Sequence, residues 1–337
     1  QTDAKGQRTE MTYDVLGRML TRVDDAGSAG AAARTSTWVY DTAAMGVGKL
    51  ASSSGYGYAA SNLYDSLGRP SSATETIDGT GYTTTTTYDA SGRPYRTAYA
   101  SGLTVESVFN AYGHSTQMQN VVSGLVYWRA DAADARGNIT QSTLGAGVAN
   151  VVEERFYNPQ TGRLSSISTA KGSTNLQQLS YQFDALANLT SRTDARQGLS
   201  ESFLYDSLNR VTSYAVTAGS GSTTVDVTYD RLGNITSKSD VGAYSYAATS
   251  ICAVNAARPH VVISVSGTKN TTYCYDANGD MTSGDGRMVT FSAFGMPTTI
   301  TQTLRSIEIA YGPDRARFKR VDINETGTKT TRYTVPM

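Results

Sequence analysis

The chain has 337 residues, and its 29 Lys and Arg residues balance its 29 Asp and Glu residues. Without net charge it has no broad electrostatic attraction for nucleic acid or an anionic membrane surface, and we expect neither as a partner. The most apolar run, His260–Val265, is far shorter than the roughly 20 residues that span a bilayer, so no membrane span is expected. The chain begins at Gln1 and shows no basic segment followed by an apolar one, so we expect a fragment whose targeting signal lies upstream.

One six-residue pattern recurs along the chain: an aromatic residue, Asp or Asn, two variable residues, Gly, and a polar residue that is often Arg or Asn. Its clearest copies, in chain order, contain Tyr13, Asp14, Gly17 and Arg18; Tyr64, Asp65, Gly68 and Arg69; Tyr88, Asp89, Gly92 and Arg93; Tyr229, Asp230 and Gly233; and Tyr275, Asp276 and Gly279. Less regular copies start at Phe109, Tyr157, Phe183, Tyr205, Phe291 and Tyr311, Asp134–Asn138 keeps only the second half, and Tyr40–Asp41 is a further candidate. Neighbouring copies start about 23 residues apart, which indicates a tandem repeat.

Each copy predicts a strand followed by a tight turn. Apolar residues alternate before the aromatic position, as in Val225, Val227 and Tyr229, and this period of two is typical of a strand with one apolar face. The Asp carboxylate can accept backbone N–H groups two residues on, and the Gly supplies a positive φ. One repeat has room for one β-hairpin, and an isolated hairpin is unstable in water, so the hairpins must pair edge to edge.

The predicted fold class is therefore all-β, with tandem β-hairpins in one continuous antiparallel sheet. We expect at least 40% of the residues in strands and no helix longer than two turns, because no window shows a helical period. Asn209 replaces the turn Gly in one copy and suits a left-handed conformation, whereas Ala187 in another predicts a distorted turn. The glycine-rich segments 77–82 and 218–222 are expected to be looser connections, and none looks like a domain linker, so residues 1–337 form a single array.

The motif Tyr-Asp-x-x-Gly-Arg at this period resembles the YD repeats of RHS proteins. That family includes bacterial RHS polymorphic toxins, the C component of insecticidal Tc toxins, and the teneurins. Residues 258–337 resemble the part just upstream of the RHS core, through Arg258-Pro259-His260, Tyr275–Met281 and Ala310–Arg315.

The resemblance implies a sheet that spirals into a hollow shell around a C-terminal effector, in a secreted or cell-surface bacterial protein. The implied partners are the remainder of the shell, a C-terminal toxin domain, and a secretion or delivery apparatus. The family's autoprotease motif centres on Asp-Pro, and this sequence has no such pair. We therefore expect a segment of structural wall without the effector.

No catalytic, cofactor-binding or metal-binding residues are expected. The only two histidines, His114 and His260, lie far apart, and His114 follows Gly113 where the repeat has its polar turn residue. The recurring Asp residues are explained by turn capping. A calcium site at Asp276, Asp280 and Asp285 is a weaker alternative, because the chain has no compact acidic loop of calcium type.

The alternative function is a cell-surface adhesion or carbohydrate-contacting module. Aromatic side chains exposed to solvent can stack on sugars, and the pairs Tyr56/Tyr58 and Tyr244/Tyr246 lie outside the repeat motif. Such a module would expose these pairs. A shell segment needs aromatic residues only within the hairpin stack.

The two cysteines, Cys252 and Cys274, predict a disulfide across neighbouring strands. They lie about one repeat apart, so the hairpin stack can bring them side by side. Paired strands hold Cα atoms about 4.5–5.5 Å apart, within the range that a disulfide accepts. Two buried free thiols are the alternative. A disulfide would favour an oxidising, extracellular destination.

Overall fold

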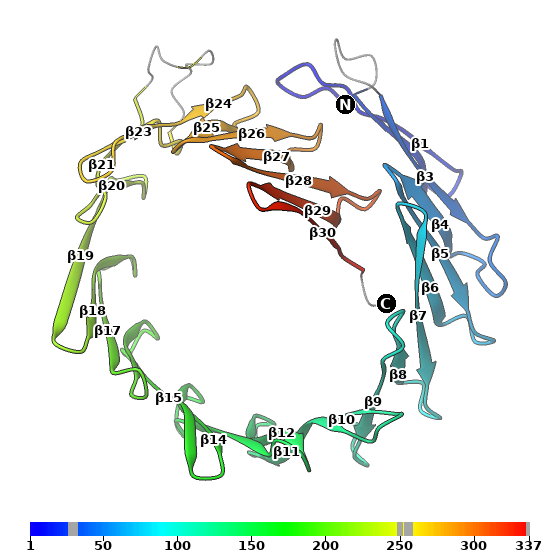
Figure 1. The fold of residues 1–337 in the computed structure, drawn as a ribbon, viewed down its shortest axis with the longest axis horizontal. Coiled ribbons are helices and arrows are strands. Elements are labelled where there is room, and N and C mark those ends of the chain that lie inside the picture. Colours follow the sequence, from blue (N-terminus) through cyan, green and yellow to red (C-terminus); the bar gives the residue numbers. More distant parts are fainter. Residues whose placement is uncertain (26–32, 248–251, 253–258, 335–337) are drawn as a thin grey trace. The chain divides into compact units, whose positions relative to one another are not determined.

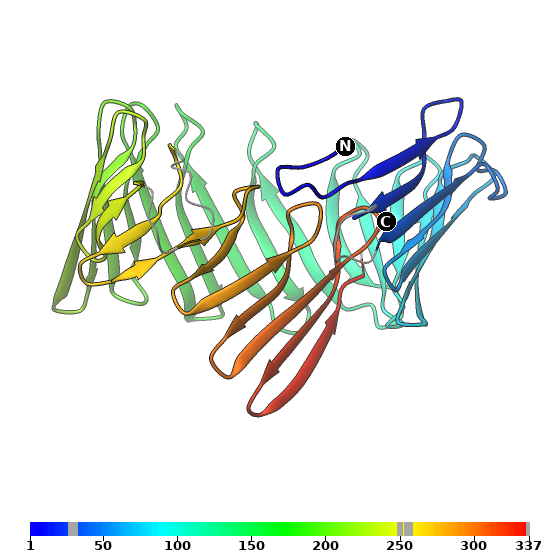
Figure 2. The same cartoon turned by 90° about the horizontal axis from the view of Figure 1, so that it is seen from above.

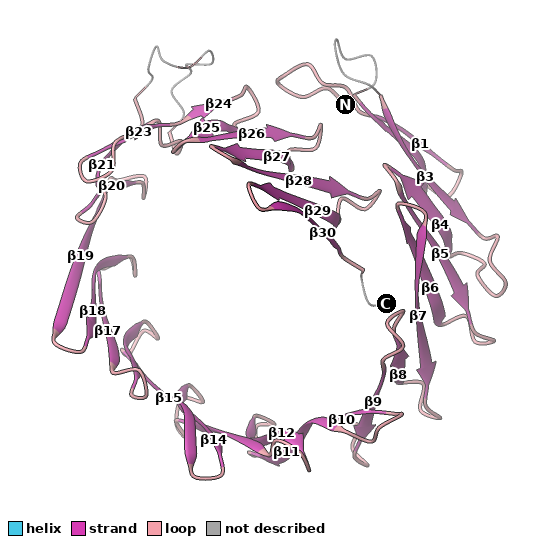
Figure 3. Ribbon diagram, viewed as in Figure 1, coloured by secondary structure: helices cyan, strands magenta, loops and turns pink. Residues whose placement is uncertain are grey.

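The structure, a computed structural model, describes residues 1–25, 33–247, 252 and 259–334. Within these ranges every regular element is a β-strand (Figure 3), and the strands contain more than 40% of the chain. They form one long sheet of 23 strands and a second of seven, with antiparallel pairing throughout. This confirms the predicted fold class. The described part of the chain contains no helix that could cross a membrane.

The chain divides into two compact units, and the second of these comprises Leu103–Tyr244 and Ser266–Lys269. In it each strand pairs with the next along the chain, and Figure 2 shows these green strands side by side with turns at both ends. The strands are β9 (Thr104–Phe109), β10 (Ser115–Asn120), β11 (Val126–Ala133), β12 (Ile139–Ala146), β13 (Val151–Tyr157), β14 (Leu164–Lys171), β15 (Thr174–Phe183), β16 (Leu189–Asp194), β17 (Leu199–Tyr205), β18 (Val211–Ala218), β19 (Gly221–Tyr229), β20 (Ile235–Lys238) and β21 (Gly242–Ser245).

The first unit comprises Gln1–Gly102, Ser245–Val265 and Asn270–Met337, and so joins the two ends of the sequence. Its N-terminal strands, blue to cyan in Figure 1, are β1 (Glu10–Tyr13), β2 (Met19–Asp24), β3 (Arg34–Tyr40), β4 (Leu50–Gly55), β5 (Tyr58–Tyr64), β6 (Pro70–Ile77), β7 (Thr80–Tyr88) and β8 (Pro94–Ala98). After the short β22 (Ser264–Ser266) and β23 (Thr271–Thr272) comes the seven-stranded sheet, with β24 (Cys274–Tyr275), β25 (Met281–Gly284), β26 (Arg287–Phe291), β27 (Pro297–Gln302), β28 (Arg305–Tyr311), β29 (Arg317–Asn324) and β30 (Gly327–Arg332).

The pairing shifts by one residue at the aromatic position of the repeat. In β17 and β18, Leu204 pairs with Ser213 and Tyr205 pairs with Val211. Thr212, between Val211 and Ser213, is therefore the extra residue. The same irregularity precedes the turns after Tyr64, Tyr157 and Tyr229. Such β-bulges bend a strand and increase its twist. The repeat thus introduces the same local bend at one end of each of these hairpins.

The alternation expected from the sequence is visible in the burial of β19. Val225 and Val227 are buried, whereas Thr224, Asp226 and Thr228 between and beside them are exposed. Few described side chains are buried as fully as these two valines, because most strands have one side only partly covered. Contacts between neighbouring hairpins therefore matter more to this fold than a deep core.

The connections expected to be loose are tight. Asp78 and Gly79, with φ of 50° and 79°, form the two-residue turn between β6 and β7. Only Gly219 and Ser220 separate β18 from β19. Two-residue turns with positive φ match the twist of paired strands, so the glycines there serve hairpin formation rather than flexibility.

Candidate functional site

The motif Asp builds the same hydrogen-bonded turn in each regular copy. Asp65 N donates to Arg69 O at 2.9 Å, and Gly68 N donates to Asp65 O at 2.8 Å. The Asp65 carboxylate accepts Leu67 N and Arg69 N through Oδ1, both at 2.9 Å, and Arg69 Nε through Oδ2 at 2.7 Å. The same side-chain bonds recur at Asp14, Asp89 and Asp206 with Arg as the last residue, and at Asp134, Asp184 and Asp230 with Asn.

The motif Tyr and Arg connect one repeat to the next. Tyr88 Oη donates to Pro70 O of the preceding repeat at 2.7 Å, and the Arg69 guanidinium lies 4.2 Å from the centre of the Tyr88 ring. Tyr229 repeats both contacts, with Val211 O at 2.8 Å and Arg210 at 4.6 Å. Tyr64, Tyr205, Tyr275 and Tyr311 also donate to backbone carbonyls. Tyr13 differs, because its hydroxyl contacts Met11 Sδ and its side chain is exposed.

The two substituted turns both keep the left-handed conformation. Asn209 has φ 59°, as the sequence predicts. Ala187 has φ 78°, and its turn retains the bonds from Asp184 N to Asn188 O and from Ala187 N to Asp184 O. The expected distortion at Ala187 is therefore wrong. The Asp184 carboxylate accepts three donors, and these bonds hold the alanine in a conformation that its Cβ disfavours.

The aromatic motif missed the turn at Asp3. Asp3 N donates to Gln7 O, Gly6 N donates to Asp3 O, and Asp3 Oδ1 accepts the backbone N–H groups of Lys5 and Gln7. The aromatic position holds Thr2, so a search that begins from an aromatic residue passes over it. The spacing from Asp3 to Gly6 is the signal that could have identified it.

The turns at Asp3 and Asp276 bind each other reciprocally. Lys5 Nζ lies 2.9 Å from Asp276 Oδ2, and Asn278 Nδ2 donates to Asp3 Oδ2 at 2.6 Å. In a regular turn this Oδ2 accepts the side chain four residues on. In the turn at Asp276 the residue four positions on is Asp280, which is acidic. In the turn at Asp3 it is Gln7, and the Gln7 side chain donates to Asp25 instead. Each carboxylate is therefore completed by the opposite turn. No metal-binding group of carboxylates or other ligands occurs among the described residues.

A buried ion pair holds the turn at residues 312–316 against β2. Arg22 Nε lies 3.0 Å from Asp24 Oδ2, and Arg22 Nη1 donates to Pro313 O at 3.0 Å. Arg22 and Asp24 are 4% and 1% exposed, and Pro313 is also fully buried. The Arg22 guanidinium also faces the rings of Trp38 and Phe294, at 5.6 and 5.7 Å. We call Arg22, Asp24, Tyr56, Tyr58, Phe294 and Pro313 the interlock.

Tyr56 and Tyr58 belong to the interlock rather than to a free surface. Tyr56 Oη donates to Asp24 Oδ2, and Tyr58 Oη donates to Glu75 Oε1 at 2.6 Å. Burial, and then the bond to Asp24, raises the pKa of Tyr56 to about 12, and burial beside Glu75 likewise raises the pKa of Tyr58. The Tyr58 ring also packs on Phe318 of β29, with ring centres 5.3 Å apart. Tyr244 and Tyr246 are only half-buried.

Two more ion pairs lie beside the interlock. Asp78 in the turn after β6 lies 2.8 Å from Lys319 Nζ and 3.1 Å from Arg332 Nη2, which places it against β29 and β30. Lys319 is the main cause of the lowered pKa of Asp78. These charges are about one-third exposed, so their contribution to stability is small and sensitive to salt.

A cavity of about 720 Å³ adjoins the interlock within the first unit. Asp24, Arg34 and Tyr56 line it on the N-terminal side, and Phe294 and Tyr311 on the C-terminal side. Its lining includes the acidic residues Asp24, Asp25 and Glu308 and the basic residues Arg34 and Lys319.

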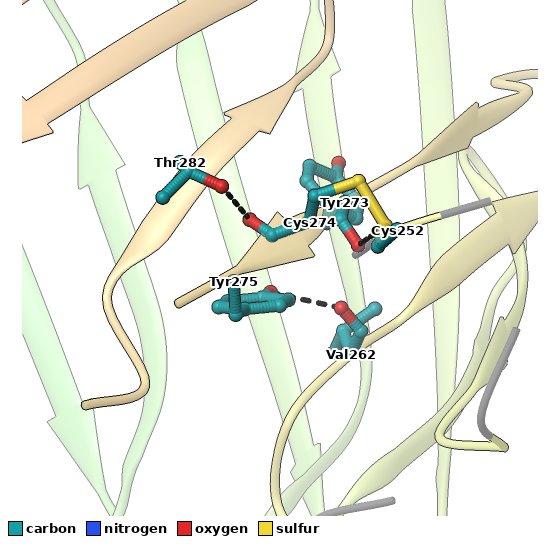
Figure 4. The surroundings of a disulfide bond; sticks show 6 residues. All are labelled: Cys252, Val262, Tyr273, Cys274, Tyr275 and Thr282. Atoms are coloured by element: carbon teal, nitrogen blue, oxygen red, sulfur yellow. Dashed lines mark hydrogen bonds between the residues drawn. A yellow bond between two sulfur atoms is a disulfide. The ribbon is translucent and has the colours of Figure 1, made fainter. Parts of the chain in front are cut away.

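The two cysteines are joined, with their Cα atoms 5.4 Å apart (Figure 4). The bond does not link neighbouring strands, which corrects the expected geometry. Cys274 opens β24, but Cys252 is a buried residue at a bend outside any strand. Beside them Tyr275 Oη donates to Val262 O at 2.8 Å, and Thr282 Oγ1 donates to Cys274 O at 3.2 Å. The disulfide thus joins Cys252 to the first strand of the seven-stranded sheet.

The histidines and the alternative calcium residues have ordinary structural positions. His114 ends a turn, and its N–H donates to Asn110 Oδ1 at 3.0 Å. His260 lies in a turn before β22. Asp276 is paired with Lys5, and Asp285 lies 3.5 Å from Arg287. Arg258, in the segment compared with the RHS core region, lies outside the described residues.

No protein-family model and no curated protein matches the sequence. Solved structures do match. The crystal structure of TcdB2-TccC3-TEV aligns with a TM-score of 0.78 over 99% of this chain at 17% identity. The Photorhabdus luminescens Tc holotoxin pore and the TcdB2-TccC3-Cdc42 complex both align with a TM-score of 0.75 over 98% of it, at 17% identity. The chain spans 19% of each of these longer chains. It therefore has the fold of one stretch of a Tc toxin chain, which is the fold that its resemblance to YD-repeat proteins implies.

Proposed function

We propose that this chain is a structural segment of the wall of an RHS/YD-repeat toxin shell, which encloses a C-terminal effector. The observation that carries the proposal is the match of nearly the whole chain to Tc toxin chains about five times as long. The partners are the remainder of the shell, the enclosed toxin domain and a delivery apparatus. Residues 258–337 precede the core region in this arrangement.

The contacts of the motif residues support a wall rather than an enzyme. In each regular turn the Asp carboxylate accepts hydrogen bonds from donors of its own turn, as Asp65 does. The motif Tyr donates its hydroxyl to a backbone carbonyl of the preceding repeat, as Tyr88 does. Carboxylates and hydroxyls bonded in this way serve the turns and the contacts between repeats, and they are not placed to exchange protons with a substrate. The disulfide supports a secreted or surface destination, because such bonds persist in oxidising compartments.

The adhesion alternative has less support. An adhesive surface needs aromatic faces open to solvent, but the hydroxyls of Tyr56 and Tyr58 are bound to carboxylates and the Tyr58 ring packs on Phe318. Of the two, Tyr58 contacts the C-terminal part of the sequence through Phe318, and Tyr56 binds Asp24 within the N-terminal part.

Limited proteolysis of the full-length protein that carries this segment tests the proposal. With an epitope tag at its C-terminal end, the enclosed part should survive trypsin until guanidinium opens the wall. The same C-terminal part expressed alone is the control and should be digested at once. Equal rates of digestion in the two preparations would contradict enclosure.

A further inference from the structure

The turns at Asp3 and Asp276 contact each other partly through Asn278, whose side chain donates to Asp3 Oδ2 at 2.6 Å. Asn278 occupies the position two residues after the turn Asp, which in the regular repeats stands directly before the turn Gly. An asparagine at this position therefore produces an Asn-Gly pair. Asn278-Gly279 is the one such pair in the 337-residue sequence, and the other regular turns have Leu, Ser or Arg at the position of Asn278.

An Asn-Gly pair is the sequence in which asparagine loses its side-chain amide most readily. The backbone nitrogen of the glycine gives up its proton and attacks the asparagine Cγ, a new C–N bond closes a five-membered imide, and the side-chain nitrogen leaves as ammonia. Water then opens the imide at one of its two carbonyls, which leaves aspartate or isoaspartate in place of the asparagine. Glycine favours the attack because it has no Cβ to crowd the ring. The reaction needs no enzyme and no reactant other than water.

Two hydrogen bonds of the folded chain restrain this reaction at Asn278. Gly279 N, which is the attacking atom, donates to Asp276 O at 3.0 Å. Asn278 Nδ2, which is the leaving nitrogen, donates to Asp3 Oδ2. The first bond keeps the proton on the attacking nitrogen, and the second holds the amide against the opposite turn. The reaction therefore requires that the contact between the two turns opens.

We propose that Asn278 is a site of spontaneous deamidation, and that the reaction makes opening of this contact irreversible. A carboxylate in place of the amide has no N–H to donate to Asp3 Oδ2. Both groups are charged at neutral pH, because the pKa of an Asp side chain is about 3.9. Like charges at hydrogen-bond distance repel each other, so the reacted turn cannot bind the Asp3 turn as before. Isoaspartate also lengthens the backbone of the turn by one carbon, which disturbs the turn itself.

Three other turns supply an internal control for the role of the glycine. Asn138, Asn188 and Asn234 also donate their side-chain amides to the carboxylate of a turn Asp, at 2.9, 2.9 and 2.8 Å. Each of them is followed by Ile or Leu, whose side chain hinders the attack of the backbone nitrogen. Deamidation should therefore occur at Asn278 and not at these three residues.

Peptide mapping by mass spectrometry tests the site. The 337-residue chain is incubated folded, at mildly alkaline pH, and the mass gain of deamidation is followed at each asparagine. The variant Asp3→Ser keeps a hydroxyl that can cap its own turn but is too short to reach Asn278, so Asn278 should react several-fold faster than in the wild type. Asp184→Ser is the matched control, because it removes the acceptor of Asn188 in the second unit and should leave the rate at Asn278 unchanged.

Three results of the mapping would overturn the proposal. The first is an Asn278 that stays intact in the folded wild type while it reacts in the urea-unfolded chain. The second is an equal rate at Asn278 in the wild type and in Asp3→Ser. The third is a faster reaction at an asparagine that is not followed by Gly.

Hydrogen exchange tests the effect of the reaction on the contact. Asn278→Asp introduces the charge of the product directly, and residues 3–9 should lose protection. Asn278→Ser removes the amide without adding a charge and should lose less, because the repulsion from Asp3 is then absent. Equal losses in the two variants, or no loss in Asn278→Asp, would show that the new charge does not keep the turns apart and would overturn the irreversible step.

Discussion

The turn aspartates keep their charge because each is surrounded by donors from its own turn. The Arg69 side chain is the main cause of the lowered pKa of Asp65, and the Asn188 side chain is the main cause at Asp184. At Asp89 and Asp206 the backbone N–H of the following Arg is the main cause. The charged carboxylate is thus bound more tightly in the folded chain than in the unfolded one.

A loss of stability in acid follows from these carboxylates. The pKa values of these carboxylates in the folded chain lie below the unfolded value of about 3.9. At a pH between the folded and the unfolded pKa values, the unfolded chain binds more protons than the folded chain, so stability falls as pH falls through this window. We expect the urea midpoint to be nearly constant from about pH 7 to 5 and to drop below about pH 4. The double variant Asp65→Asn/Asp184→Asn should show a shallower drop. A midpoint that does not change down to about pH 3 would contradict the role given to these turns.

Ala187 and Gly233 offer opposite tests of the left-handed turn position. Ala187 has φ 78°, so Ala187→Gly should raise the free energy of unfolding by about 1 kcal/mol. Gly233 has φ 88°, and a Cβ there would meet nothing within 4 Å, so Gly233→Ala should lower it by a similar amount through the backbone alone. Urea unfolding of the two variants and the wild type measures both changes. Shifts of the same sign would show that something other than φ controls the position.

Between elements, the hydroxyl of the motif Tyr links one hairpin to the hairpin before it, as at Tyr88 and Tyr229. Tyr229→Phe removes the donor to Val211 O and leaves the ring in place, so we expect a loss of about 1 kcal/mol in the free energy of unfolding. Tyr112→Phe is the matched control, because that side chain is 88% exposed and its loss should change little. Equal changes in the free energy of unfolding of the two variants, measured by urea unfolding, would contradict a stabilising role for the hydrogen bond from Tyr229 to Val211 O.

The sequence predicts the hairpins because their determinants are local. Alternation in Val225–Tyr229, the Asp carboxylate and the left-handed Gly all act within a few residues, and they recur in each regular copy. The same reasoning failed where one determinant was missing, as in the Asp3 turn without its aromatic residue. It also mistook Asp78-Gly79, a favoured hairpin turn, for a loose connection.

The interlock could not be predicted, because its partners are distant in the sequence. Arg22 and Pro313 are 291 residues apart, and nothing near either residue identifies the other. The pattern Arg22-Val23-Asp24 could have indicated an ion pair on one face of a strand, but not the turn that covers it. The position of Cys252 outside a strand also escaped prediction, because the spacing of two cysteines in the sequence does not determine which elements carry them.

Within the first unit, replacing Arg22 should lower stability more than replacing any other residue of the interlock. The side chains of Arg22 and Asp24 are 5% and 2% exposed, so Arg22→Met leaves a buried carboxylate whose cation is gone. Breaking one partner of a buried pair costs about 3–5 kcal/mol. Hydrogen exchange should show β28, β29 and the turn at 312–316 losing protection, while β9–β20 of the second unit keep theirs.

Two variants separate the buried pair from a general effect of lost charge. Arg22→Met/Asp24→Leu removes the uncompensated carboxylate and should recover part of the protection, because two apolar residues can replace a buried ion pair. Lys238→Met removes the partner of Asp240 in a more exposed pair 3.3 Å apart and should change exchange little. If Arg22→Met leaves exchange in β28 and β29 unchanged, the ends of the sequence are held together by Asp78 and the Lys5–Asp276 contact, and Arg22 only fills space.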